Sequence, residues 1–239
     1  MKPIYESERV TIWLGDAREV LPLLGKETVD CVATDPPYGV AWQSNTRKDT
    51  FDLIGGDTPE EASGLLQAVV GDIVRVTRRT RHLYTFGLPL VHPLLAAKAE
   101  LVWDKERLGS GDLSSVWSPS HERIYFHVRA QDKTNAERGG RLAARLRRGS
   151  VIRLPRLSAM QVKRHPTEKP VELMRQLIES STSFGEVVLD PFAGVGSTLV
   201  AAVLEGRRAI GVELDERYAH IAAERVDAAE RISAQGEAA

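Results

Sequence analysis

The chain has 239 residues, of which 42% are hydrophobic and 27% charged, the composition of an ordinary globular protein of one domain. The formal net charge of −1 decides nothing about a nucleic-acid partner, and apolar runs far shorter than roughly 18 residues argue against a membrane span. We see no signal-peptide pattern, and the single cysteine, Cys31, excludes an intrachain disulfide and a cysteine-based metal cluster, so we expect an intracellular protein.

Short β-branched apolar runs alternate with amphipathic stretches along the chain, which predicts alternating strands and helices. The expected strands are residues 10–14, 29–34, 82–86, 101–103, 124–128, 187–189 and 209–212. The expected helices are residues 17–24, a segment from Pro59 to 78–81, 89–100, a segment from its cap at Thr167 to Gly185 with Pro170 in its first turn, 197–205, and 216–232 with a frayed tail after it. This alternation indicates a single α/β domain over 1–239, with a parallel sheet and helices on both of its faces.

Acidic side chains follow four of the expected strands, namely Asp16, Asp35, Asp190 and Glu213. Ligands of parallel α/β sheets bind beyond the carboxyl ends of the strands. We therefore expect these four carboxylates to converge on one crevice.

The strand at 29–34 leads directly into Asp35-Pro36-Pro37-Tyr38, a pattern suited to gripping an amine on a nucleobase. Such an amine is a poor nucleophile, because its lone pair is delocalised into the ring. The Asp35 carboxylate and the Pro36 carbonyl, held by the rigid Pro36-Pro37 pair, can accept its two N–H groups, and Tyr38 offers a stacking face for a base flipped out of a duplex. The alternative is a tight turn after a strand. Cys31 lies inside the strand pattern, so we expect a buried side chain and no covalent adduct.

Residues 190–197, Asp-Pro-Phe-Ala-Gly-Val-Gly-Ser, link an expected strand to an expected helix. Gly194 and Gly196 permit a sharp turn and a close approach to a ligand. The segment has neither the third glycine of a dinucleotide-binding loop nor the Gly-Lys-Ser/Thr of a P-loop. Glu213 ends the next strand, 17 residues after Gly196, where a carboxylate can bind the two hydroxyls of a ribose. The alternative is that the glycines serve the turn alone.

Two further segments can carry function. The first is His165-Pro166-Thr167-Glu168-Lys169-Pro170, at the start of an expected helix. A carboxylate can be attracted there by the free N–H groups of the helix start, by the Thr167 hydroxyl and by the Lys169 charge. The alternative is a simple N-cap beside a surface lysine. Residues 129–164 contain 11 Lys or Arg and 2 Asp or Glu, whereas the whole chain is nearly neutral. A basic segment on an acidic body indicates phosphate contacts, and a solvated surface loop is the alternative.

Together these motifs resemble those of the amino-group DNA methyltransferases, which modify adenine N6 or cytosine N4. The resemblance covers residues from about 11 to 226 and rests on 35–38, 165–170 and 190–197, with weaker matches at Gly15-Asp16 and His121-Glu122. The catalytic motif precedes the cofactor motif, which is similar to the circularly permuted β order of the family. The resemblance implies a Rossmann-like sheet of seven strands, S-adenosyl-L-methionine as methyl donor, and no metal.

The resemblance also implies roles for individual residues. It assigns the target base to Asp35, Pro36, Pro37 and Tyr38, with direct attack of the amine on the methyl group. It places around the cofactor Asp16 at the adenine ring, Thr167 and Lys169 at the methionine carboxylate, and Asp35, His165, Asp190, Phe192, Gly194, Gly196, Ser197, Thr198 and Glu213. It also implies a target-recognition segment at 129–164, short for the family, so that a short target site or a second subunit would fit. The candidate DNA contacts are Arg47, Lys48, Arg138, Arg141, Arg145, Arg147, Arg148, Arg153 and Arg156.

Aspartate in the first place of the catalytic motif favours adenine, because cytosine-N4 members of the family more often carry serine there. The prediction is therefore a site-specific adenine-N6 methyltransferase of double-stranded DNA, of the restriction–modification kind, cytoplasmic and prokaryotic or phage-encoded. A homodimer is an expectation from the family alone. The alternatives are cytosine-N4 transfer, methylation of RNA or of a protein amide, and a nucleic-acid-binding protein without catalysis.

Overall fold

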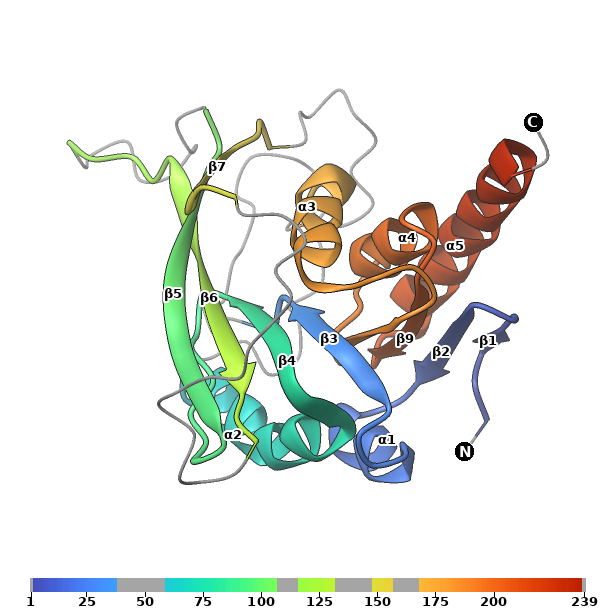
Figure 1. Ribbon diagram of the computed structural model, residues 1–239, viewed down its shortest axis with the longest axis horizontal. Helices are drawn as coiled ribbons and strands as arrows, with labels where there is room; N and C mark the ends of the chain where they lie inside the picture. Colours follow the sequence, from blue (N-terminus) through green and yellow to red (C-terminus); the bar gives the residue numbers. More distant parts are fainter. Residues whose placement is uncertain (1, 38–58, 107–115, 132–147, 157–167, 238–239) are drawn as a thin grey trace.

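A computed structural model of the chain describes residues 2–37, 59–106, 116–131, 148–156 and 168–237. The described residues form one mixed sheet in the strand order β1-β2-β9-β8-β3-β4-β6-β5-β7 (Figure 1). The strands are β1 (Tyr5–Glu6), β2 (Val10–Leu14), β3 (Val29–Thr34), β4 (Thr77–Phe86), β5 (Leu95–Asp104), β6 (His121–Arg129), β7 (Val151–Arg153), β8 (Val187–Asp190) and β9 (Arg208–Glu213). The five central strands, from β2 to β4 in this order, are mutually parallel.

The sheet differs from the expected one in two respects. It is mixed rather than parallel, because β6 runs antiparallel to both β4 and β5, and β1 runs antiparallel to β2. The described part of the chain holds nine strands, where the resemblance implies seven. β1 and β7, of two and three residues, are the two edges of the sheet and were not expected.

Helices cover both faces of the sheet, as the sequence predicts. α1 (Ala17–Val20), the 3-10 turn η1 (Leu21–Leu23) and α2 (Pro59–Val76) lie on one face, and α3 (Val171–Ser181), α4 (Ser197–Leu204) and α5 (Glu216–Glu237) on the other. Each layer has its own core, because successive side chains of a strand point to opposite faces: Cys31 and Ala33 belong to one core and Val32 to the other. No helix among the described residues is long and apolar enough to cross a membrane.

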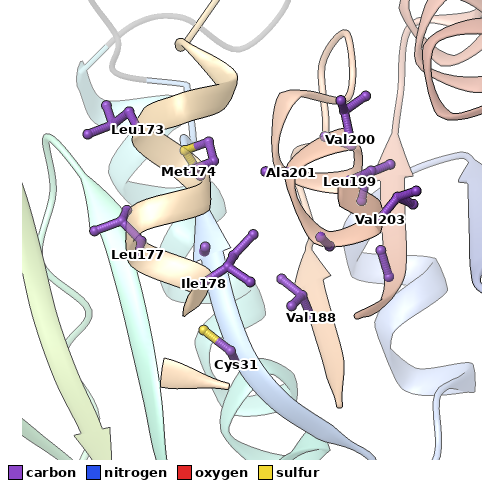
Figure 2. Close-up of a cluster of buried hydrophobic side chains, with 14 of the residues drawn as sticks. Cys31, Leu173, Met174, Leu177, Ile178, Val188, Leu199, Val200, Ala201 and Val203 are labelled. Carbon is purple, nitrogen blue, oxygen red and sulfur yellow. The ribbon is translucent and has the colours of Figure 1, made fainter. Parts of the chain in front are cut away.

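α4 lies at the centre of its layer, in contact with both α3 and α5. Its run Ser-Thr-Leu-Val-Ala-Ala-Val-Leu is buried from 197 to 203, which explains why it lacks a polar face. Figure 2 shows Met174 and Ile178 of α3 directed toward α4, above Cys31 and Val188 of the strands. Burial raises the pKa of the Cys31 thiol well above its ordinary value, which agrees with a core side chain rather than a nucleophile.

Several expected element boundaries are wrong. Residues 89–100 do not form a helix, because 95–104 form β5 between β6 and β7; the pairing partners on both sides outweigh the helical propensity of Ala96 to Glu100. α2 ends at Val76, and the arginines at 78–81 already belong to β4. α1 ends at Val20, where Pro22, which has no N–H group, favours the short 3-10 turn. Pro170 is the N-cap of α3, and α5 continues to Glu237 instead of fraying after 232.

Candidate active site at the carboxyl edge of the sheet

Four acidic residues stand at the carboxyl ends of neighbouring parallel strands. β2, β9, β8 and β3 are adjacent in this order, and Asp16, Glu213, Asp190 and Asp35 lie at or just after their ends. The first two ends are joined directly, since Gly15 N donates to Glu213 O at 2.9 Å. The structure therefore brings together at one edge the residues that the sequence places beyond four separate strands.

Asp190 fixes the loop that follows β8. Its carboxylate is buried and accepts hydrogen bonds from Thr34 Oγ1 and Thr198 Oγ1, each at 2.6 Å, and from Phe192 N at 3.1 Å. Burial raises the pKa of this carboxyl, while the Thr198, Thr34 and Phe192 donors favour the charged form. Asp190 thus ties the loop to β3 and to the first turn of α4, so its side chain shapes the site from within.

The two loop glycines meet different surroundings. Gly196 has φ +79°, and a Cβ built there would lie 2.9 Å from Ala222 Cβ of α5, so the backbone is pressed against that helix. Gly194 has φ +53°, and a Cβ there would meet no described atom within 4 Å. Ser197 Oγ, at the start of α4, is buried without a hydrogen-bond partner among the described residues. The loop therefore packs on one side and is open at Gly194.

Glu213 and Asp16 are held in fixed orientations beside this loop. Glu213 Oε2 accepts from Gly194 N at 2.7 Å and Oε1 accepts from Asp215 N at 2.8 Å, while burial raises the pKa of this carboxyl. Asp16 caps α1 by accepting from Arg18 N at 2.8 Å, and its carboxylate also pairs with the Arg18 guanidinium at 2.5 Å. The hydrogen bonds from Arg18 lower the pKa of Asp16, so this group stays ionised.

Asp35 is the last member of a partly buried chain of alternating charges, in which Lys169 is the buried member. Lys169 Nζ lies 2.5 Å from Asp35 Oδ2 and 3.3 Å from Glu122 Oε2, and Lys105 Nζ lies 2.7 Å from Glu122 Oε1. The Lys169 side chain is 6% exposed and that of Asp35 19%. The Lys169 ammonium also lies 5.1 Å from the centre of the Phe86 ring, at the end of β4.

The pKa values along this chain follow from burial and from the neighbouring charges. Burial and the Glu122 carboxylate raise the pKa of Asp35 to about 6, against the pull of Lys169. Burial alone would lower the pKa of Lys169, but Asp35 and Glu122 together raise it. Burial alone would raise the pKa of Glu122, but Lys169 and Lys105 together lower it. At neutral pH Asp35, Glu122 and Lys169 are therefore ionised, and of the two carboxylates that of Asp35 protonates first on acidification.

Of the catalytic motif, Pro36 is buried and Pro37 half-buried beyond the end of β3, whereas Tyr38 lies outside the described residues. Of the expected cofactor residues, His165 and Thr167 also lie outside the described part. The others gather at the edge where β2, β9, β8 and β3 end.

The family model N6_N4_Mtase, described as DNA methylase, matches residues 29–224. The chain belongs to this family of DNA methylases. The match confirms the resemblance that the three motifs carry. This methylase is 32% identical over 231 residues to YubD of Escherichia coli (strain K12), across 94% of this chain and 93% of YubD. It is 27% identical over 263 residues to the DNA adenine methyltransferase YhdJ of the same strain, across 97% of this chain and 87% of YhdJ.

Solved structures share the fold of this methylase. TTHA0409 from Thermus thermophilus, solved in complex with S-adenosyl-L-methionine, has a TM-score of 0.63 at 25% identity and covers 94% of this chain and 96% of its own. The cytosine-N4-specific PvuII DNA methyltransferase has a TM-score of 0.69 at 16% identity and covers 98% of this chain and 94% of its own. At such low identity the second likeness shows the fold alone.

Lys169, which the resemblance places at the methionine carboxylate of the cofactor, has two acidic partners in the structure, and its role toward the cofactor stays a prediction. Its ammonium contacts Asp35 and Glu122, and its neighbour Glu168 pairs with Arg225 of α5 at 2.8 Å. The sequence indicated Glu122 only through the weak His121-Glu122 match, and no pattern in the sequence pointed to Lys105 or Arg225. These residues come from β6, from the end of β5 and from the last helix, so their spacing along the chain carries no signal of their proximity.

Three of the nine candidate DNA contacts lie within the described residues. Arg153 on β7 is 74% exposed and stands 3.8 Å from Asp104, so it is open to a phosphate. Arg148 is bound to Glu179 and Ser180 of α3 and is partly neutralised. Arg156 is half-buried. The other six, for which the structure makes no statement, are Arg47, Lys48, Arg138, Arg141, Arg145 and Arg147.

Proposed function

We propose that this methylase transfers a methyl group from S-adenosyl-L-methionine to the N6 amine of adenine in a base flipped out of double-stranded DNA. Membership of the family makes the chain an amino-group DNA methyltransferase that uses this cofactor, and adenine is the finer step of the proposal. The observation that carries it is the Asp35 carboxylate, which stands one strand away from the glycine loop, held 2.5 Å from Lys169 and still partly exposed.

The residues around the loop fit S-adenosyl-L-methionine. The open side of Gly194 leaves room for a ligand against the backbone. Each oxygen of Glu213 accepts one backbone N–H and keeps a second lone pair, which is the arrangement that two ribose hydroxyls require. Asp16 lies next to Glu213 across the strand ends, and we therefore place it beside the adenine ring of the cofactor. When bound, the cofactor supplies an electrophilic methyl group.

Asp35 prepares the amine for attack. Its carboxylate accepts one N–H of the base amine and the Pro36 carbonyl accepts the other, which draws the nitrogen lone pair out of the ring. Because its pKa is about 6, Asp35 is ionised at neutral pH and can accept. When the amine nitrogen gains the methyl group, the demethylated cofactor would leave as a neutral thioether. The nitrogen, now cationic, would then release one proton to the Asp35 carboxylate, which already accepts a hydrogen bond from that N–H. Before the proton arrives, the Lys169 ammonium stabilises the ionised form of Asp35.

The choice of adenine rests on one observation from the motif and one from a relative. The first is aspartate, rather than serine, at position 35 of the motif. The second is that the relative YhdJ, similar over 97% of the chain, is a DNA adenine methyltransferase. Cytosine N4 is the second candidate, because the same two acceptors serve either amine and the PvuII enzyme has this fold.

Recognition of DNA is assigned to residues 129–164. This segment begins at the last residue of β6 and contains β7, which pairs with β5 beside Lys105. Its described part therefore lies next to the catalytic end of the sheet. Catalytic residues 35–38 precede cofactor residues 190–197, and we assign the chain to the permuted β order of the family on this basis. A cytoplasmic location and a homodimer stay predictions.

The test is product analysis. Purified protein is incubated with S-adenosyl-L-methionine and unmethylated duplex DNA, and the nucleosides of the digested DNA are identified by mass spectrometry. We expect N6-methyladenine from the wild type and from Asp227→Ala, an exposed control on α5, and none from Asp35→Ala. N4-methylcytosine would overturn the choice of base. Full transfer by Asp35→Ala would overturn the mechanism.

A further inference from the structure

The adjacent residues Glu168 and Lys169 contact different parts of the molecule. Lys169 reaches Asp35 and Glu122 on the catalytic side. Glu168 reaches Arg225 on α5, with Glu168 Oε1 2.8 Å from Arg225 Nη2. The side chains of Glu168 and Lys169 are 5% and 6% exposed. Charged side chains this buried are retained only with partners, so each pair fixes one side of the dipeptide.

Arg225 also holds the cofactor loop. Its Nη1 donates to Val195 O at 2.5 Å, and Val195 stands between the two loop glycines, Gly194 and Gly196. A single guanidinium, 11% exposed, thus links α5, the loop and the Glu168 carboxylate. Arginine suits this position because its planar fork donates to two acceptors at once, which a lysine ammonium on a flexible stem does less well.

We propose that Arg225 is a positioning residue for methyl transfer, which couples the cofactor loop to Asp35 through Glu168 and Lys169. Arg225 contacts the loop backbone and Glu168, and the next residue, Lys169, contacts Asp35. The inference rests on the proposed function, because it takes the loop as the cofactor site and Asp35 as the catalytic group. It predicts that a change on the far helix alters both cofactor affinity and the ionisation of Asp35.

The experiment uses three variants of the full chain. Arg225→Met removes the contacts of the guanidinium with Val195 and Glu168, and Arg225→Lys keeps the positive charge. Glu168→Gln removes the negative charge that faces Arg225 but keeps the size of the side chain. Arg231→Met is the matched control, since Arg231 is an arginine of the same helix that is 75% exposed. For each, calorimetry gives the Kd for S-adenosyl-L-methionine, and methyl transfer at saturating cofactor and varied DNA concentration gives kcat, KM for DNA and the pH profile.

We expect Arg225→Met to weaken cofactor binding about tenfold and to lower kcat about 100-fold, the loss expected when catalytic groups shift by about 1 Å. KM for DNA should stay unchanged. The acid limb of its pH profile should move upward, because Lys169 is less firmly held against Asp35. Arg225→Lys should restore part of each loss, Glu168→Gln should shift the limb in the same direction, and Arg231→Met should match the wild type.

The role of Arg225 is overturned if folded Arg225→Met, checked by circular dichroism, keeps the cofactor Kd and the pH profile of the wild type. It is also overturned if Arg225→Met lowers only the melting temperature and leaves the cofactor Kd and the pH profile unchanged, since a purely structural residue behaves in that way. If Arg225→Met fails to fold, Arg225→Lys and Glu168→Gln decide the question by the same readouts. If the wild type binds the cofactor but methylates no DNA, the proposed function is wrong. The cofactor affinities of the variants would still test the effect of Arg225 on the loop.

Discussion

Replacing Lys169 by methionine is the sharpest test of the charge arrangement at Asp35. The change keeps the length and most of the apolar volume of the side chain but removes the ammonium 2.5 Å from Asp35 and 3.3 Å from Glu122. Two partly buried carboxylates, those of Asp35 and Glu122, then face each other without the cation that separates them. The charged form of Asp35 loses its main support, so its pKa must rise further.

The size of this rise can be worked from the geometry. An opposite charge in direct contact lowers the pKa of an aspartate by about 1–3 units, so its loss should raise that of Asp35 by the same amount. From the present value of about 6, the new value lies at roughly 7–9. At pH 7.5 the ionised fraction falls from about 97% to between roughly 3% and 75%. Stability should also fall by about 3–5 kcal/mol at a pH where both carboxylates are ionised.

The assay is kcat/KM for methyl transfer to duplex DNA between pH 5 and pH 9. The wild type should lose activity as the pH falls through about 6, because a protonated Asp35 no longer accepts from the amine. The acid limb of Lys169→Met should lie at least about one unit higher, with activity recovered in alkali. Lys105→Met is the control, because the Lys105 ammonium pairs with Glu122 and acts on Asp35 only through it, so its limb should move less. A limb of Lys169→Met that coincides with that of the wild type would refute the reasoning.

Three further predictions follow from single contacts. Glu122→Gln removes a like charge that raises the pKa of Asp35, so the acid limb should move to lower pH; a shift upward would contradict the assignment. Gly196→Ala forces a Cβ to 2.9 Å from Ala222 at φ +79°, so its melting temperature should fall, by an amount equivalent to about 1–3 kcal/mol. Gly194→Ala meets no described atom and costs only about 1 kcal/mol of backbone strain, so it should melt near the wild type yet bind S-adenosyl-L-methionine more weakly in calorimetry; unchanged affinity would show that the open side of the loop is not the cofactor site.

Prediction from the sequence worked best where the signal is local. The strand at Val29–Thr34 and the loop after β8 were found because a buried parallel strand is continuously apolar and a sharp turn needs glycine. It failed at β5, where helix-forming residues adopt a strand because β6 and β7 supply the pairing partners. Propensity describes a segment alone, whereas a ladder depends on a neighbour that the segment does not contain.

By itself the sequence determined the family, the α/β class and the set of acidic residues at the strand ends, because each follows from residue types at short spacing. Only the tertiary structure decided which charges are buried and with which partner. Lys169 and Asp35 are 134 residues apart, and nothing near either one indicates that they meet. No sequence pattern indicated a role for Arg225, which follows only from its contacts with Val195 of the loop and with Glu168. A charged residue is the same letter in solvent and in a core, and its pKa and role are set by neighbours that folding brings to it.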